Sequence, residues 1–573
     1  MSLIWSSSES SVFPLPHILK STMPATVQPI RLKSQLPDKD LKAINWPKVA
    51  STSFNLWAAG ITIVIGGQYF SWNGGLTAGT LSYGIAAVMM GFAYICMGLC
   101  EAEMASMFPF EGGAFGLARC TWGFYAGFIV GCCEALQYII YVACAFVSFG
   151  KMLGSFWPFA ESQPYIIWFL AYALSSFTLI LGGKIYWRWN VALALYSIGI
   201  IIIYVFGSMP YVDIKKFGGG QEYLVVGGFS QFMKVFPMSA WFYVGVESIN
   251  RLCSDAYEPR LSVPIAQISC ILTLFCSAVM VYFVAISMHP GMPEISKALS
   301  PLNYGFERMF NCSDDVSVWF SIPATFATGQ GFVQSYSKIL TCMAGSGLLP
   351  AKMHEKHSSL NTPIYAIVLG SIVSYCLCFL DYFYSLDAIF FNTCMVMGSI
   401  SYTSQCVGYL YLKKNFRTME RKFQSPLGKA GAMCSIFVWV LLAVAVVGFQ
   451  DDHQDSFIAL VAILLICTVY YQFYAKSRQK FSEEERMSLF FAHVANHNKA
   501  KRSMNSRKRH HSGGFFNLVK RVAMSKVSTS MGPSNSNPQI ARASSAGKMK
   551  RSSGISKDPS LIEVQSPPMR RKK

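Results

Sequence analysis

The chain has 573 residues, of which 53% are hydrophobic, 14% aromatic and only 13% charged. Because soluble domains carry about a quarter charged residues, this composition excludes an ordinary soluble protein and indicates a protein embedded in lipid. The formal net charge of +19 resembles that of a nucleic-acid-binding protein, but the position of the charges along the chain, given below, argues against such a partner.

Twelve apolar runs follow an N-terminal segment, residues 1–50, that we expect to be a cytoplasmic tail. Each run is long enough to cross roughly 30 Å of hydrocarbon as a helix of about 20 residues. A segment in lipid must satisfy its own backbone hydrogen bonds, so each run is predicted to be helical. We expect an all-α integral membrane protein with twelve transmembrane helices, within a domain over residues 51–476, at about 53–72, 80–105, 123–150, 165–183, 190–210, 233–250, 264–288, 316–343, 363–383, 387–411, 432–449 and 456–474.

The basic residues of the short loops predict the orientation. With the N-terminus inside, the inner loops hold thirteen Lys and Arg residues and the outer loops hold five. The excess on the inner side predicts that both termini are cytoplasmic. The only N-x-S/T sequon begins at Asn311 in an outer loop, which makes Asn311 a candidate glycosylation site. We expect a multi-pass protein of the plasma membrane.

Two of the predicted spans are interrupted by glycine. Gly66 and Gly67 interrupt the first span and Gly245 interrupts the sixth, and glycine lets a helix open where its backbone lines a cavity. Because these spans are five apart, two five-span repeats would place the breaks in corresponding positions, with the second repeat inverted. Such paired breaks indicate a mid-membrane site for a small ligand. The alternative is that glycine only permits close helix packing. The neighbouring polar residues Gln68 and Glu247 favour the ligand site over this alternative.

Ionisable groups inside a membrane are costly and mark functional sites by default. Glu134, in the third span, is flanked by glycines at helical spacing and is expected to face the bundle interior. Glu247 is expected near a bound ammonium or a proton relay, or alternatively to cap the helix or pair with Arg251 one turn later. Lys338 follows Gln334 in the eighth span, where its ammonium either replaces a bound cation or extends to the inner surface.

A different interpretation applies to the acidic end of the second span. Glu101 and Glu103 are expected near the cytoplasm, where pairing with Arg119 is favoured over a role in carrying protons.

The charge is concentrated in residues 477–573. This segment has 21 Lys and Arg against five acidic residues, a net +16, which leaves only +3 for the rest of the chain. We therefore expect a basic, largely disordered cytoplasmic tail that is attracted to anionic lipids, and no nucleic-acid partner. Residues 481–501 and 515–527 are predicted to form short helices, the second of them basic and amphipathic. The alternative is a solvated tail that limits aggregation.

Four segments resemble, in order and spacing, the motifs of one family: the break at 65–70, the run 103–119 after the second span, the stretch 247–264 after the sixth span and the end of the eighth span at 345–350. They resemble the amino acid-polyamine-organocation superfamily of secondary transporters over roughly residues 50–475. Ser71-Trp72-Asn73 resembles the ethanolamine-permease branch in particular.

This resemblance implies a leucine-transporter-type core of 5+5 inverted repeats plus two extra helices, and transport by alternating access. It implies that a substrate carboxylate binds the backbone amides of the first break, Ile65, Gly66, Gly67 and Gln68. It implies that the substrate amine binds carbonyls and a ring of the sixth span, from Trp241, Phe242, Val244 and Gly245. Gln68 replaces a glycine of the family motif and could read a hydroxyl, which favours a small amino alcohol or zwitterion over a large cationic amino acid.

The prediction is a secondary transporter of amino acids or small amines such as ethanolamine, with no cofactor and with coupling to H⁺ or Na⁺. All nine histidines lie in tails, loops or span edges, and His354 and His357 are three residues apart, not four as a helical zinc motif requires. Without a P-loop or a G-x-S-x-G turn, ATP-driven pumping and hydrolysis lack support. The prediction is therefore that the chain is not an enzyme and holds no metal. A channel and a transporter-like amino-acid sensor remain as alternatives.

Overall fold

The computed structural model describes residues 51–109, 111–417, 419–482 and 485–486, all within one compact unit. The predicted N-terminal tail, the predicted helix 515–527 and most of the predicted helix 481–501 lie outside these residues. The described residues form helices and contain no regular strand, only an isolated bridge between Ser51 and Ala256. The predicted all-helical fold class is therefore confirmed.

The long helices occur at the predicted positions, and proline lies in the first turn of three of them, α7, α11 and α14. In chain order the longer helices are α2 (Ser53–Val64), α3 (Thr80–Met107), α4 (Gly113–Thr121), α5 (Phe124–Gly154), α7 (Pro164–Leu181), α8 (Gly183–Ser208), α10 (Gly228–Val235), α11 (Pro259–Ile286), α14 (Ile322–Gly345), α15 (Ile364–Tyr384), α16 (Asp387–Asn415), α17 (Gly428–Phe449) and α18 (Asp455–Tyr470). The shorter helices are α6 (Pro158–Ser162), α9 (Ile214–Phe217), α12 (Asn303–Phe310), α13 (Asp314–Ser317) and α19 (Lys476–Arg478).

Eight helices in the described part of the chain are long and apolar enough to cross a membrane: α3, α5, α7, α8, α11, α15, α17 and α18. The other four predicted spans fall on helical segments that are shorter or more polar. α2 has only 12 residues before its break, the segment 228–255 is divided into short pieces, and α14 and α16 are less apolar.

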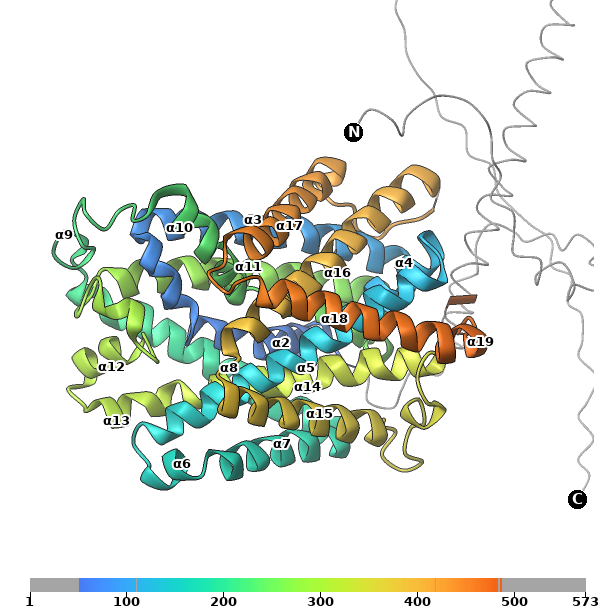
Figure 1. The fold of residues 1–573 in the computed structure, drawn as a ribbon, viewed down its shortest axis with the longest axis horizontal. Coiled ribbons are helices and arrows are strands. Elements are labelled where there is room, and N and C mark those ends of the chain that lie inside the picture. Colours follow the sequence, from blue (N-terminus) through green and yellow to red (C-terminus); the bar gives the residue numbers. More distant parts are fainter. Residues whose placement is uncertain (1–50, 110, 418, 483–484, 487–573) are drawn as a thin grey trace, which may run out of the picture. The chain divides into compact units, whose positions relative to one another are not determined.

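The polar composition of α14 follows from its central position. Twenty of its 24 residues are buried, and a helix that is enclosed by protein needs no apolar face toward lipid. It packs on α5, α2 and α8, and Figure 1 shows these helices in the middle of the bundle, with α7 and α15 along one edge and α17 along the opposite one.

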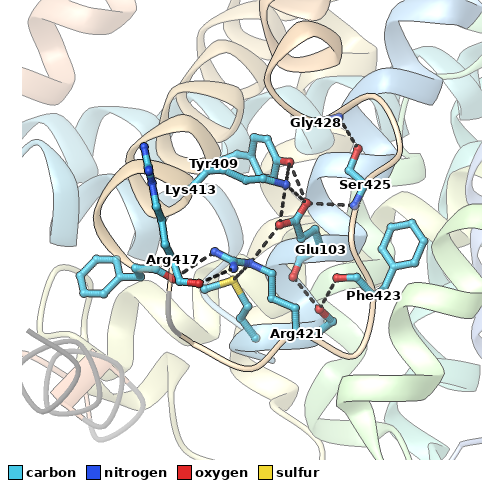
Figure 2. Close-up of polar contacts among 11 residues, drawn as sticks. Glu103, Tyr409, Lys413, Arg417, Arg421, Phe423, Ser425 and Gly428 are labelled. Atoms are coloured by element: carbon cyan, nitrogen blue, oxygen red, sulfur yellow. Dashed lines mark hydrogen bonds and ion pairs between the residues drawn. The ribbon is translucent and has the colours of Figure 1, made fainter. Parts of the chain in front are cut away.

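The loop between α16 and α17 is held against the end of α3 by one buried carboxylate (Figure 2). Glu103 accepts hydrogen bonds from the Tyr409 hydroxyl at 2.7 Å, the Lys413 ammonium at 2.8 and 2.9 Å and the Ser425 amide at 2.9 Å. The Arg421 guanidinium lies 2.9 Å from the same carboxylate. Only 1% of Glu103 is exposed, so these partners replace the water that the charge would otherwise require.

Substitution of this carboxylate should destabilise the fold. We expect Glu103→Ala to lower the free energy of unfolding by about 3 kcal/mol. The substitution removes a buried acceptor from all four of the donors that surround it. Unfolding of the detergent-solubilised protein by heat or denaturant measures the loss of stability. Glu420→Ala is the matched control, since Glu420 is exposed and its ion pair with Lys422 is 3.6 Å long. Equal stability of the two variants would contradict this role of Glu103.

Candidate functional site

Both predicted helix breaks are present. α2 begins with Thr52 as its N-cap and ends at Val64, after which Ile65–Gln68 forms a single 3₁₀ segment. The sixth predicted span is a 3₁₀ segment over Phe236–Phe242 and a second one over Val246–Asp255. Gly245, between these two segments, has a φ of +103°, a backbone conformation that side-chain-bearing residues rarely adopt. The glycines therefore interrupt both helices, as their positions predict.

The two breaks contact each other directly. A Cβ atom added to Gly67 would overlap the carbonyl oxygen of Trp241, and it would lie 2.9 Å from the carbonyl carbon and 3.3 Å from Cδ1 of the indole ring. Only glycine fits between α2 and the sixth span at this point. The structure thus brings the residues predicted for the substrate amine next to those predicted for the substrate carboxylate.

Aromatic side chains close the junction between the breaks. The Trp241 ring packs edge-on against Phe70, Tyr141 and Phe391, at ring-centroid distances of 5.7, 5.6 and 5.8 Å. The eight predicted substrate-binding residues are all buried: Ile65, Gly66, Gly67, Gln68, Trp241, Phe242, Val244 and Gly245. The protein therefore encloses these residues in this conformation.

Two buried polar atoms at the breaks have no hydrogen-bond partner among the described residues: Oε1 of Gln68 and Nε1 of Trp241. The side-chain nitrogen Nε2 of Gln68 donates to the Leu274 carbonyl of α11 at 3.0 Å, so only the oxygen of this side chain is without a partner. Buried polar atoms normally have a partner, and these two provide an acceptor and a donor for one.

The Gly66 amide is not without a partner, although the resemblance implies that it binds substrate. It donates to the hydroxyl of Thr328 on α14 at 2.8 Å. Sequence reasoning missed Thr328, because its contact with Gly66 joins residues 262 positions apart. It also missed the hydroxyls of Tyr138 and Tyr402, although Tyr138 lies one helical turn after Glu134.

Glu247 is held by neutral donors. Its Oε1 accepts from the hydroxyls of Tyr138 at 2.7 Å and Tyr402 at 3.0 Å, and its Oε2 accepts from the Gly245 amide at 3.1 Å. Only 2% of the residue is exposed, and it has no ion pair among the described residues. The alternative that Glu247 pairs with Arg251 is wrong, because Arg251 pairs with Glu134.

The other buried charges near the breaks have partners. Glu134 faces the bundle interior, as expected, and its ion pair with Arg251 is fully enclosed. Arg251 also donates to the Tyr138 hydroxyl at 2.9 Å, which connects this pair to Glu247. Glu101 accepts from the side-chain amides of Asn250 at 3.1 Å and Gln267 at 2.9 Å.

The two polar candidates on α14 do not contact the breaks. The side-chain oxygen of Gln334 accepts from the Tyr186 hydroxyl of α8 at 2.6 Å. The Lys338 ammonium lies 2.8 Å from Asp255 and 3.5 Å from Glu111, so it joins α14 to the end of the sixth span. Across the described residues, no group of three or more His, Cys, Asp or Glu side chains could hold a metal ion.

The predicted pairing of Glu101 and Glu103 with Arg119 is wrong. The Arg119 guanidinium instead donates to both carboxylate oxygens of Glu485, at 2.8 and 2.9 Å, and both side chains are fully buried. Arg119 also donates to the Lys480 carbonyl at 3.0 Å, and the Lys480 amide donates to the Ser346 carbonyl at 2.9 Å. The first residues of the predicted tail are thus bound to α4 and to the residue after α14.

Asn311, the predicted glycosylation site, follows α12 and is exposed. Its glycosylation stays a prediction.

Loss of the Arg119–Glu485 pair should release this part of the tail. We expect Arg119→Ala and Glu485→Gln each to speed tryptic cleavage after Lys480 at least about tenfold, because removal of one partner leaves the other charge buried and unpaired. Mass spectrometry of the first fragments identifies the bond that is cut. Arg188→Ala, at an exposed arginine of α8, is the control and should cleave like the wild type. Unchanged cleavage after Lys480 in both variants would contradict the role of the pair.

The family model and the relatives among known proteins indicate the same family. The model of the amino acid permease family matches residues 56–485. A branched-chain amino acid permease of Lactococcus lactis subsp. cremoris is 23% identical over 355 residues, 56% of this chain and 75% of that protein. A dicarboxylic amino acid permease of Saccharomyces cerevisiae is 24% identical over 455 residues, 71% of each chain.

Among solved structures, the manganese transporter of Eremococcus coleocola is similar with a TM-score of 0.48 and 14% identity, over 73% of this chain and 93% of that one. The family match, by contrast, covers most of the chain and includes both helix breaks. The chain belongs to the amino acid permease family and is therefore a multi-pass membrane transporter and not an enzyme.

Proposed function

We propose that the chain is a secondary active transporter that moves amino acids or small amines such as ethanolamine by alternating access. The observation that carries the proposal is the contact between the two breaks, where Gly67 lies against the Trp241 carbonyl in a fully buried junction. A ligand between the breaks requires them to move apart, and alternating access opens such a site to one side of the membrane and then to the other. This conformation corresponds to a closed state.

Twelve membrane-spanning helices in two inverted repeats of five, with α17 and α18 as the extra helices, are part of the proposal. Helices overlap all twelve predicted ranges, and the breaks occur in the first and sixth of them. We further propose that residues 51–476 form the transporter domain in the plasma membrane. In this proposal residues 1–50 and 477–573 are cytoplasmic tails, the second of which binds anionic lipids.

The chemistry of the junction supports a substrate with an amine and a hydrogen-bonding group. Glu247 brings a negative charge that is held only by neutral donors, and a substrate ammonium would provide the missing positive charge. The Trp241 indole N–H could donate to a substrate carboxylate or hydroxyl, and Gln68 Oε1 could accept from a hydroxyl or an ammonium. The names of the two relatives, which are permeases of branched-chain and dicarboxylic amino acids, also favour an amino acid.

We also propose that coupling to H⁺ or Na⁺ drives the transport. Three buried carboxylates, Glu101, Glu134 and Glu247, lie near the breaks, and only Glu134 has an ion pair among the described residues. A proton or a cation that enters with the substrate would balance this negative charge. Glu247 is the candidate carrier because its carboxylate also binds the Gly245 amide at the second break.

The position of Gly67 provides a direct test of the site. We expect Gly67→Leu to lower saturable uptake of labelled amino acids or ethanolamine at least about tenfold, because a side chain there forces the two breaks apart. Gly199→Leu in α8 is the matched control, since a Cβ atom at Gly199 meets nothing within 4 Å. Normal uptake by the Gly67 variant would exclude the proposed site.

The same assay separates the alternatives. Large currents that do not saturate with substrate concentration would indicate a channel. Binding of substrate without flux would indicate a sensor.

Glu247→Gln tests the carrier role. The variant keeps the size of the side chain but removes its negative charge, so we expect lower uptake and a flatter dependence of uptake on pH. Glu161→Gln, at an exposed glutamate of α6, is the control and should transport like the wild type. If uptake by Glu247→Gln keeps the wild-type level and pH dependence, Glu247 is structural.

A further inference from the structure

The break in α2 begins at a single hydrogen bond. In an α-helix, the amide of each residue donates to the carbonyl four residues earlier. This pattern holds up to Ile65, whose amide donates to the Ile61 carbonyl. The next amide, that of Gly66, would donate to the Thr62 carbonyl. It donates instead to the Thr328 hydroxyl at 2.8 Å, and that hydroxyl donates to the Thr62 carbonyl at 3.2 Å.

We propose that Thr328 is a positioning residue of the substrate site, whose hydroxyl is inserted into the bond between Gly66 and Thr62 and holds the first break open. A hydroxyl suits this place because it accepts from the amide and donates to the carbonyl at once. A side chain inserted in this way is a known cause of helix interruption. The inference rests on the proposed function of this break as a substrate site.

The packing of α14 against α2 makes room for the hydroxyl. A Cβ atom at Gly66 would lie 2.5 Å from the Thr328 hydroxyl and 2.9 Å from its Cβ atom, so any larger residue would displace the hydroxyl. One turn further along α14, a Cβ atom at Gly331 would lie 2.6 Å from Cα of Ile63. Glycine on both helices therefore lets α14 approach close enough for Thr328 to reach the backbone of α2.

Another threonine of α14 shows that this bonding is specific to position 328. A buried threonine in a helix commonly donates to a carbonyl of its own helix. Thr325, one turn earlier and equally buried, does so, with its hydroxyl 3.1 Å from the Ser321 carbonyl. Thr328 donates across to α2 instead. Glycine alone weakens the helix, but it does not supply the partners that the Gly66 amide and the Thr62 carbonyl have here.

The function of the hydroxyl follows from what its removal permits. Without it, the Gly66 amide can bond directly to the Thr62 carbonyl, and α2 can continue through the break. In the structure the amides of Gly67 and Gln68 belong to the 3₁₀ segment Ile65–Gln68, and in a continuous α-helix they would take α-helical positions, which changes the backbone that faces the sixth span. Loss of the hydroxyl should therefore weaken substrate binding more than it slows the turnover of bound substrate.

The test compares Thr328→Val, Thr328→Ser and the control Thr325→Val by the concentration dependence of uptake, corrected for protein at the cell surface. Valine keeps the shape of threonine without the hydroxyl, and we expect it to raise KM at least about tenfold. Serine restores the hydroxyl and should keep KM within about twofold of wild type, as should Thr325→Val. An unchanged KM for Thr328→Val, or an equal rise for Thr328→Ser, would overturn the proposal.

Gly66→Ala keeps the proposal testable if Thr328→Val does not reach the surface. The added methyl group should displace the hydroxyl and raise KM in the same way, whereas an unchanged KM for Gly66→Ala would overturn the proposal. A cryo-EM structure of full-length Thr328→Val separates this inference from the proposed function, because it needs no transport. We expect α2 to run without interruption through Gly66 in that variant. A break that persists there overturns the role of Thr328 even if transport occurs as proposed.

Discussion

The contact of the Gly67 backbone with the Trp241 carbonyl is the constraint on which the rest of the site depends. No side chain fits between these two points, so the first and sixth predicted spans must approach each other through backbone. Such an approach places two interrupted helices side by side, with Gly245 in a conformation that glycine favours. The aromatic rings around Trp241 and the central helix α14 then enclose the junction. A site built in this way is closed until the two segments move.

The distribution of buried charge distinguishes the junction from the rest of the bundle. Away from the breaks, two buried sites join opposite charges: Glu103 lies among Lys413 and Arg421, and Arg119 binds Glu485. These pairs connect helices and loops and so contribute to the fold. At the second break, Glu247 accepts hydrogen bonds from hydroxyls and backbone and has no ion pair in the described residues. A buried carboxylate without an ion pair is suited to bind a substrate ammonium, a cation or a proton reversibly.

Much of this arrangement could be predicted from the sequence, because it depends on local pattern. Apolar runs predicted the helix positions, and glycine within them predicted the two breaks. The partners of polar groups could not be predicted in this way. Thr328 lies 262 residues from Gly66 and Glu485 lies 366 residues from Arg119, so those contacts depend on how helices pack. The wrong pairing of Arg119 with Glu101 and Glu103 followed from choosing acidic residues close to it along the chain.

The most direct test of the proposed site is a cryo-EM structure of the full chain in lipid nanodiscs with a transported amino acid or ethanolamine at saturating concentration. The predicted result is ligand density between residues 65–68 and 241–245, with the backbone of Gly67 separated from the Trp241 carbonyl and the ligand amine near Glu247. Ligand density elsewhere in the bundle, with Gly67 still in contact with Trp241, would contradict the proposed site.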